Sequence, residues 1–227
     1  MLFRSLEQKK IKWLSVGRDH LNSFLAFSQF LAGIKEPSLL LDVSLPEASV
    51  QCCQYLSQYF SKDSVSPLFT GMIIGTTGHK EKNIFIELSK KIPMCLVSNF
   101  SRGVFLFEQI LSAQTAEGKP LKDLFSELGF EIHMNEVHHI HKKDAPSGTA
   151  LTLAEKINFP IEKISSQREG EVIGIHSVQL KNDSEELIMT HSAFSRDVFA
   201  EGAVDLCVKF LHKKPVPGYY QKEFFWK

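Results

Sequence analysis

The stretch Met72-Ile73-Ile74-Gly75-Thr76-Thr77-Gly78 decides the fold class of this chain. Its apolar residues fit a strand that is buried on both faces, and the Gly/Thr turn ends that strand. A helical apolar pattern over residues 84–92 follows, Pro93 ends it, and residues 94–97 form another apolar strand. This order of strand, helix and strand is typical of a parallel sheet with crossover helices.

The same alternation extends towards the N-terminus. Residues 39–43 are a short apolar run, and Pro46 opens a segment in which apolar residues repeat at helical spacing. The series therefore predicts an α/β fold with a Rossmann-like, doubly wound parallel sheet. Further upstream we expect a helix over residues 2–10 and a strand over residues 12–16.

The second half of the chain has a different pattern, which predicts an α+β unit with an open mixed sheet. We expect strands over residues 131–141, 172–180 and 187–193, helices over residues 103–113 and 202–211, and a further helix starting near Ser147. Residues 215–226 read as a tail rich in proline and aromatic residues.

The composition of the chain excludes several functional classes. Among 227 residues, 26 Lys and Arg balance 26 Asp and Glu, so no net charge attracts nucleic acid or anionic lipid. The longest apolar runs are far shorter than the ~20 residues that span a bilayer, and the charged start is unlike a signal peptide. Four cysteines without a Cys-x-x-Cys pair fit reduced thiols. We therefore expect a cytoplasmic protein that binds neither nucleic acid nor membrane.

The densest group of candidate functional residues is the sequence EVHHIHKKDAPSGTA, which begins at Glu136. Alternate residues of a strand share a face. Glu136, His138 and, if the strand persists, Lys142 would point one way, whereas His139 and His141 would point the other way.

A helix start follows this strand. Pro146 and Ser147 break the chain, and the new helix N-terminus offers free N–H groups and partial positive charge to a carboxylate or phosphate. Gly148 lets a ligand approach the backbone closely, and Thr149 adds a hydroxyl donor. Together with the histidines and the lysine, this pattern predicts a pocket for a small dianion.

Two other interpretations compete with the pocket. Taken singly, the histidines are surface residues of a strand and Ser147 is an ordinary helix N-cap. A metal site is the second alternative, because His139 and His141 can share a face. No carboxylate or cysteine completes a local set with the usual zinc spacing, so we favour the dianion pocket and expect no metal.

Two polar loops follow predicted strands of the first half, at Gly75-Thr76-Thr77-Gly78 and at Ser98-Asn99-Phe100-Ser101. Open α/β folds bind ligands at the edge where the carboxyl ends of parallel strands meet. The two loops therefore predict a cofactor groove.

On these residues, the chain resembles the dihydrodipicolinate reductase family, the 4-hydroxy-tetrahydrodipicolinate reductases of lysine and diaminopimelate biosynthesis. The resemblance is densest over residues 136–150 and extends over about residues 38–212. Further segments in the family's order and spacing are Asp42-Val43-Ser44, Gly75-Thr76-Thr77-Gly78, Asn99-Phe100-Ser101, Arg168-Glu169-Gly170, Ser195-Arg196 and Gly202-Ala203-Val204.

The resemblance implies two domains and a reductase activity. A dinucleotide-binding domain would comprise residues 1–102 and 197–227, and a substrate-binding and oligomerisation domain residues 103–196. The enzyme would use NADPH or NADH to reduce the dicarboxylate 4-hydroxy-tetrahydrodipicolinate, as a homo-oligomer like the family's tetramer. The rival hypothesis is a non-catalytic homologue that binds the dicarboxylate or a partner chain without hydride transfer.

The resemblance also assigns roles to residues. His138 resembles the family's catalytic histidine, and Lys142 resembles its proton donor. The residues that match its substrate contacts are His139, Gly148 and Thr149. The residues that match its cofactor contacts are Gly75, Thr76, Thr77, Val97, Ser98, Asn99 and Phe100.

The family's opening strand and Gly-x-x-Gly-x-Met-Gly phosphate turn have no counterpart in this sequence. We therefore expect the chain as given to bind NADPH weakly, because the pyrophosphate lacks its usual backbone donors. If residues 12–16 form the second strand, Arg18 lies at its end, where it suits the 2′-phosphate of NADPH.

Overall fold

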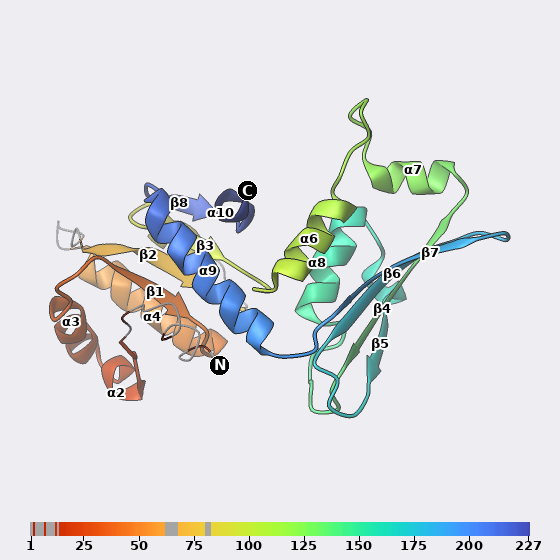
Figure 1. Cartoon of the computed structure of the whole chain (residues 1–227). Coiled ribbons are helices and arrows are strands. Elements are labelled where there is room, and N and C mark those ends of the chain that lie inside the picture. The colour runs from red at the N-terminus through yellow and green to blue at the C-terminus, as the bar shows by residue number, and fades with distance from the viewer. Residues whose placement is uncertain (1, 3–6, 8–11, 13, 62–67, 80–82) are drawn as a thin grey trace. The chain divides into compact units, whose positions relative to one another are not determined.

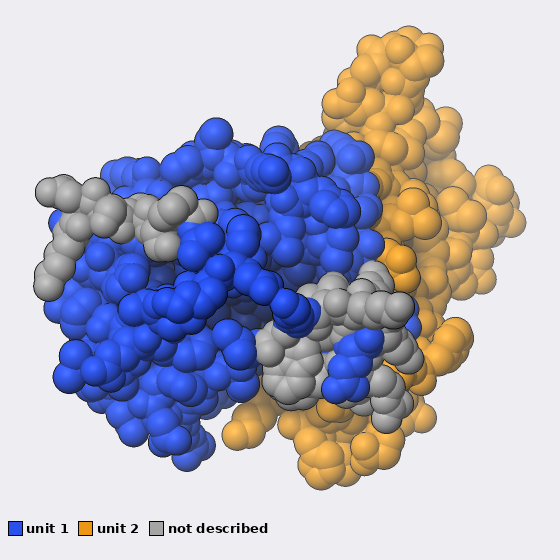
Figure 2. Space-filling model, turned by 60° about the vertical axis from the view of Figure 1, so that its left-hand side comes forward, with its two compact units in different colours: residues 1–98, 200–227 blue, residues 99–199 orange. Residues whose placement is uncertain are grey.

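The chain folds into two compact units. The computed structural model describes residues 2, 7, 12, 14–61, 68–79 and 83–227. Residues 1–98 and 200–227 form unit 1, and residues 99–199 form unit 2, as coloured in Figure 2. No helix in the described ranges has both the length and the apolar character needed to cross a bilayer.

Unit 1 is built around a parallel sheet, and the predicted α/β fold class is confirmed. Its strands are β1 (Ser38–Asp42), β2 (Phe69–Ile74), β3 (Pro93–Leu96) and β8 (Gly218–Tyr220), in the spatial order β1-β2-β3-β8 (Figure 1). Every neighbouring pair is parallel. Because Asp42 pairs with Ile74 and Ile74 with Leu96, the carboxyl ends of the first three strands align. The sequence pattern did not predict β8, which lies in the C-terminal tail.

Helices bury the apolar side chains of this sheet. They are α2 (Arg18–Leu21), α3 (Phe24–Ala32), α4 (Pro46–Tyr59), α5 (Asn83–Ser89), α9 (Asp197–Lys213) and α10 (Glu223–Trp226). Proline stands in the first turn of α4, where its missing N–H leaves no bond unmade. The core includes Phe27, Leu56, Met72, Phe85 and Met94, each at most 1% exposed. Burial of each such side chain contributes about 1.5–3 kcal/mol. All four cysteines are free thiols.

The predicted strand over residues 12–16 is wrong for the residues that are described. Lys12 and residues 14–17 belong to no helix or strand, and α2 begins at Arg18. A strand needs a neighbour to pair with, and β1 pairs with β2 alone within the described part of the chain. The helix predicted over residues 2–10 falls almost wholly outside the described residues.

Unit 2 carries the predicted mixed sheet. Its strands are β4 (Glu131–His138), β5 (Ser165–Arg168), β6 (Ile175–Lys181) and β7 (Glu186–Ser192), in the order β5-β4-β6-β7. β4 and β5 are parallel, whereas the β4–β6 and β6–β7 pairs are antiparallel. Its helices are α6 (Arg102–Leu111), α7 (Leu121–Glu127), α8 (Gly148–Ile157) and the 3-10 helix η1 (Ile161–Lys163). Figure 1 shows α6 and α8 side by side, and their apolar residues share a core with β4 and β6.

Most predicted elements of unit 2 lie within a few residues of the observed ones. The strands expected over residues 172–180 and 187–193 are β6 and β7. The strand expected over residues 131–141 is β4, which ends already at His138. Because β4 ends at His138, the residues after it, Lys142 among them, do not follow the alternation of a strand.

Gly71 in β2 occupies a position that no larger residue fits. Its φ is +142°, and a Cβ atom there would lie 2.6 Å from the carbonyl oxygen of Pro93 and 2.7 Å from Cζ of Phe210. Gly71→Ala should lower the free energy of unfolding of unit 1 by ~3 kcal/mol or more, because backbone strain and overpacking add. Urea unfolding followed by tryptophan fluorescence measures this loss, since Trp226 lies in α10 of unit 1.

Gly78→Ala is the matched control for this prediction. Its φ of +84° is also unfavourable for alanine, but the nearest contact of a new Cβ atom, Cγ of Pro46, lies at 3.8 Å. This variant should lose only ~1 kcal/mol from backbone strain. Equal losses in the two variants would contradict the steric explanation at Gly71.

Candidate functional site

In unit 1, the predicted loop over residues 75–78 follows β2 and Ser98 follows β3, both at the carboxyl ends of the parallel strands, whereas residues 99–101 of the second predicted loop belong to unit 2. The N–H of Gly75 donates to the carbonyl of Asp42 at 2.8 Å, and the N–H of Val97 donates to the last carbonyl of β2 at 2.8 Å. The Thr76 hydroxyl donates to the carbonyl of Ser44 at 3.3 Å. These bonds hold the loops that follow β1 and β2 against each other at one edge of the sheet.

The chemistry of this edge fits a dinucleotide. Thr77 and Gly78 are exposed, and Val43 and Leu45 after β1 are 55% and 69% exposed. Exposed apolar side chains beside hydroxyl and main-chain donors suit a planar ring with polar substituents. Within the described residues, Oδ2 of Asp42 is buried without a hydrogen-bond partner, so this edge also contains an unused hydrogen-bond acceptor.

Three of the predicted cofactor residues are placed differently. The side chains of Val97 and Phe100 are 1% and 8% exposed, so only their main chains are accessible to a ligand. Arg18 is exposed at the start of α2 and follows no strand among the described residues. The premise that placed Arg18 beside a 2′-phosphate is therefore wrong, and its role stays a prediction.

In unit 2, β4 presents a buried carboxylate and a buried histidine on one face. Glu136 is 0% and His138 7% exposed, and they share this face with Met134, which packs in the core with α8. The strand alternation predicted this common face for Glu136 and His138.

Lys142 lies in a turn, so the condition under which it would share the strand face of Glu136 and His138, that the strand persists to residue 142, is not met. β4 ends at His138, and beyond it the N–H of Ile140 donates to the carbonyl of Gly170 at 3.1 Å. The N–H of Lys142 then donates to the carbonyl of His139 at 3.1 Å. The Lys142 ammonium group pairs with Asp144 at 2.8 Å, and its side chain is 23% exposed.

The carboxylate of Asp144 lies where the sequence pattern predicts a ligand carboxylate. Burial raises the pKa of Asp144, but the hydrogen bond and charge of Lys142 and main-chain hydrogen bonds of Asp144 and Gly148 outweigh burial and lower it. An internal carboxylate therefore uses the donors that were predicted to bind a dianion. A substrate carboxylate has to displace Asp144 or share these donors with it.

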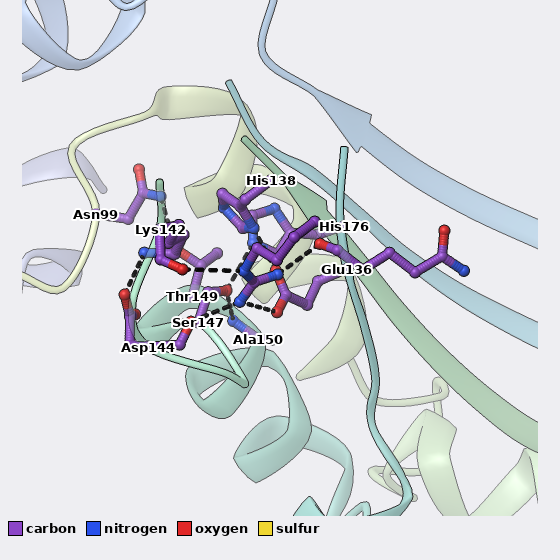
Figure 3. Close-up of polar contacts among 11 residues, drawn as sticks. Asn99, Glu136, His138, Lys142, Asp144, Ser147, Thr149, Ala150 and His176 are labelled. Carbon is purple, nitrogen blue, oxygen red and sulfur yellow. Dashed lines mark hydrogen bonds and ion pairs between the residues drawn. The ribbon is translucent and has the colours of Figure 1, made fainter. Parts of the chain in front are cut away.

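The N-terminus of α8 forms as the sequence predicts. Ser147 is its N-cap, with Oγ accepting the N–H of Ala150 at 3.2 Å. Apart from its chain neighbours and the backbone of its own helix, no atom of the described residues lies within 4 Å of the place where a Cβ atom on Gly148 would be. Thr149 is buried, and its Oγ1 accepts from Nδ2 of Asn99 at 2.8 Å (Figure 3). Because Asn99 is the donor, the hydroxyl hydrogen of Thr149 can point to a ligand.

The side chain of Asn99 joins two helix starts of unit 2. Besides the bond to Thr149, its Oδ1 accepts the N–H of Ser101 at 2.7 Å. Ser101 in turn is the N-cap of α6. Both ends of the Asn99 amide are thus used within unit 2, and its predicted cofactor contact stays a prediction.

Glu136 lies at the centre of a buried polar cluster (Figure 3). Its Oε1 accepts from Nη2 of Arg168 at 3.0 Å, and its Oε2 pairs with Nδ1 of His138. Burial alone raises the pKa of Glu136, but hydrogen bonds from Arg168, Ser166 and His138 outweigh burial and lower it. Since an ionised carboxylate only accepts hydrogen bonds, Nδ1 of His138 carries the hydrogen.

Two further histidines extend this cluster across the sheet. The ring centroids of His138 and His176 lie 5.0 Å apart, and those of His176 and His191 lie 6.4 Å apart. Nε2 of His176 and Nε2 of His191 hydrogen-bond the N-cap hydroxyls of Ser147 and Ser101, each at 3.1 Å. Burial, with the nearby His138 and His191, lowers the pKa of His176 to about 3, so His176 is neutral at pH 7.

His139 and His141 stay outside this cluster. Their ring centroids lie 6.3 Å apart, with His139 half-buried and His141 exposed. Within the described residues, the only group of three or more His, Cys, Asp and Glu side chains close enough to share a metal ion is Glu136, His138 and His176. The guanidinium of Arg168 beside Glu136 opposes a second cation there, so we interpret the group as a hydrogen-bond cluster.

The sequence analysis gave no role in the site to Arg168, His176, His191 or Asp144, although Asp144 lies in the stretch that begins at Glu136 and Arg168 in a segment that matches the family. A signal for His176 was present, because strand alternation puts it on one face with Val178 and Leu180. Arg168 had no such signal, since β5 reads Ser-Ser-Gln-Arg, a short polar segment without an apolar pattern.

The buried histidine His176 predicts a loss of stability in mild acid. Its pKa is about 3 in the folded chain and ~6.5 in the unfolded chain, so between these values the unfolded chain binds one more proton. The free energy of unfolding should fall as the pH decreases from 6.5 towards 3, by up to ~1.4 kcal/mol per pH unit from this group.

Urea unfolding followed by circular dichroism at a series of pH values measures this dependence. His176→Gln should flatten it, whereas His133→Gln, at an exposed position of β4, should leave it unchanged. If His176→Gln and the wild type lost stability in parallel below pH 6.5, the assignment to His176 would be wrong.

A parallel sheet with polar loops at its carboxyl ends in one unit, and a lysine and a helix N-terminus around a carboxylate in the other, are features that a dinucleotide-dependent oxidoreductase combines. The family model described as "Dihydrodipicolinate reductase, C-terminus" matches residues 103–224. The chain is 37% identical over 158 residues to the 4-hydroxy-tetrahydrodipicolinate reductase of Bdellovibrio bacteriovorus, and 35% identical over 186 residues to that of Thermosipho africanus. The chain belongs to the dihydrodipicolinate reductase family, which confirms the resemblance seen in the sequence.

The matches cover most of this chain and part of its relatives. The alignments span 67% and 81% of this chain, and 64% of the Bdellovibrio and 76% of the Thermosipho protein. A solved structure, described as dipicolinate-bound dihydrodipicolinate reductase from Paenisporosarcina sp. TG-14, matches with a TM-score of 0.59. That match covers 86% of this chain and 75% of the other at 18% identity, and it supports the fold.

Proposed function

We propose that this chain reduces 4-hydroxy-tetrahydrodipicolinate to tetrahydrodipicolinate with NADPH or NADH, in lysine and diaminopimelate biosynthesis. The observation that carries the proposal is the anion position in unit 2, where Lys142 and the start of α8 surround the carboxylate of Asp144. The names of the matched relatives support the same reaction. No observation favours the non-catalytic alternative.

The two units have separate tasks in this proposal. Unit 1 binds the dinucleotide at the carboxyl ends of β1, β2 and β3, where Gly75 and Thr76 supply main-chain groups and Thr77 an exposed hydroxyl. When bound, the reduced nicotinamide supplies a hydride. Unit 2 binds the dicarboxylate through Lys142, Thr149 and the N–H groups of Gly148 and Thr149, with His139 at the rim of the pocket.

Lys142 both binds and protonates the substrate. Replacing a hydroxyl by hydrogen requires loss of water and addition of one hydride and one proton. The hydride enters the conjugated ring and leaves an enamine, and the Lys142 ammonium group then protonates the neighbouring ring carbon. The resulting amine regains its proton from solvent. A positioned donor of this kind contributes on the order of 10²–10⁴-fold to the rate.

We also propose that the protein is a cytoplasmic homo-oligomer that binds neither nucleic acid nor membrane. Zero net charge supports the absence of a nucleic-acid partner. Leu187 and Ile188 on β7, at the edge of the unit 2 sheet, are 53% and 54% exposed, which supports an interface there. Light scattering of the purified chain measures its oligomeric state.

Lys142→Met should lower kcat by about 10²–10⁴-fold, because the ring carbon loses its proton donor. The fold should persist, since the side chain lies in a turn and makes a partly exposed ion pair with Asp144. The assay follows the loss of nicotinamide absorbance with freshly synthesised substrate. Lys143→Met, at the exposed neighbouring position, is the matched control and should keep near wild-type turnover.

Near wild-type turnover in Lys142→Met would exclude the proton-donor role. A wild-type chain that turns over substrate with neither NADPH nor NADH would overturn the proposed function itself.

Thr149→Val keeps the shape of the side chain but removes its hydroxyl donor. Pyridine-2,6-dicarboxylate should bind this variant about 5–150-fold more weakly, as expected when a buried carboxylate loses a donor worth ~1–3 kcal/mol. Thr152→Val in the same helix is the control, because the Thr152 hydroxyl donates to the carbonyl of Gly148 at 3.0 Å. Calorimetry measures both affinities, and an unchanged affinity in Thr149→Val would place the carboxylate elsewhere.

A further inference from the structure

The buried pair of Glu136 and Arg168 takes no part in the binding and protonation steps above. Glu136 is fully buried, and a buried ionised carboxylate is unfavourable by several kcal/mol unless partners compensate it. Arg168 compensates this charge from β5, where it stands opposite His138 in the parallel pairing with β4. The pair therefore lies at the end of β4, where Glu136 belongs to β4 and Arg168 to the neighbouring β5.

Arg168 also holds the turn that carries Lys142. Its Nη2 donates to the carbonyl of Asp144 at 2.5 Å, and its Nε donates to the carbonyl of Lys142 at 3.3 Å. The planar guanidinium presents its N–H donors in a fixed fork, which suits simultaneous contact with a carboxylate and two carbonyls. One side chain thus connects Glu136, and through it His138, to the turn of the proton donor.

We propose, on the basis of the function proposed above, that Glu136 and Arg168 are positioning residues for the reaction. Glu136 fixes the ring of His138 with its hydrogen on Nδ1, and Arg168 holds both Glu136 and the Lys142 turn in place.

This tautomer decides what His138 does. With hydrogen on Nδ1, the other ring nitrogen, Nε2, is unprotonated and accepts a hydrogen bond or a proton. The glycine at position 174 leaves space beside Nε2 of His138, because the Cβ atom of any larger residue there would lie only 3.0 Å from this nitrogen. Burial lowers the pKa of His138, against the opposing effect of Glu136, so the ring is neutral at pH 7. His138 is then an acceptor for the substrate, and Lys142 alone donates the proton.

Nuclear magnetic resonance of the full chain, labelled with ¹⁵N-histidine, tests the tautomer without any assay of activity. Two-bond nitrogen–proton correlations distinguish the tautomers, and His138→Gln assigns the signal among the nine histidines. The wild type should show protonated Nδ1 and unprotonated Nε2 at His138. In Glu136→Gln, the oxygen of the new glutamine amide accepts from Arg168, and the NH₂ group of the same amide faces Nδ1 of His138. Because this NH₂ group donates, Nδ1 has to accept, and the ring should switch to the Nε2–H tautomer.

The same strand offers a matched control. Glu131 and His133 have the same spacing on β4, but their side chains are 84% and 54% exposed and lie 3.8 Å apart. Glu131→Gln should therefore leave the tautomer of His138 unchanged.

Kinetics then connects the tautomer to the reaction. Glu136→Gln should lower kcat by about 10–100-fold, as losses of other carboxylates that orient histidines do. It should also move the acid limb of the kcat/KM profile to lower pH, because loss of the negative charge disfavours the imidazolium. Arg168→Lys keeps the charge but not the fork, so it should lower kcat while His138 keeps the Nδ1–H tautomer.

The outcomes separate this inference from the proposed function. An Nε2–H tautomer in the wild type overturns the positioning role, and this measurement stands even if Glu136→Gln fails to fold. An active wild type whose Glu136→Gln variant keeps both tautomer and pH profile overturns it as well. An inactive wild type with the predicted tautomer switch overturns the proposed reductase function and leaves the Glu136–His138 positioning intact.

Discussion

The ionised carboxylate of Glu136 is the constraint on which unit 2 depends. Both of its oxygens are satisfied inside the sheet, one by Arg168 from β5 and one by His138 from its own strand. Loss of Arg168 would leave an uncompensated buried charge, which is unfavourable by about 3–5 kcal/mol. The need to neutralise this one group therefore places β5 beside β4, orients the His138 ring and anchors the turn that follows.

In the proposed function, the two units bind their ligands by different means. Unit 1 relies on backbone geometry, because aligned parallel strands bring their last main-chain groups to one edge whatever the side chains are. Unit 2 relies on charged side chains whose positions are set by other side chains. A substitution at the edge of unit 1 is therefore expected to be tolerated more often than one in the cluster around Glu136.

The sequence predicted those parts of the molecule that local pattern determines. The apolar runs of β1 and β2, the Pro46 start of α4 and the Ser147 cap of α8 are all short-range signals. The sequence could not show that β4 ends at His138 and that the N–H of Ile140 then binds the carbonyl of Gly170, because this contact joins distant segments. For that reason the sequence left open whether Lys142 shares the face of Glu136 and His138. β5 and β8 were missed because they are short and form only by pairing with strands already in place.

The position of β8 has a consequence for the order in which the molecule can be built. β8 pairs with β3, yet all of unit 2 lies between them in the chain. During synthesis the open edge of β3 stays unpaired until the segment 218–220 leaves the ribosome, whereas unit 2 is one continuous stretch that is complete earlier. The nascent chain thus carries an exposed, apolar strand edge for the time needed to make more than a hundred residues, which gives a chaperone a defined period in which to bind.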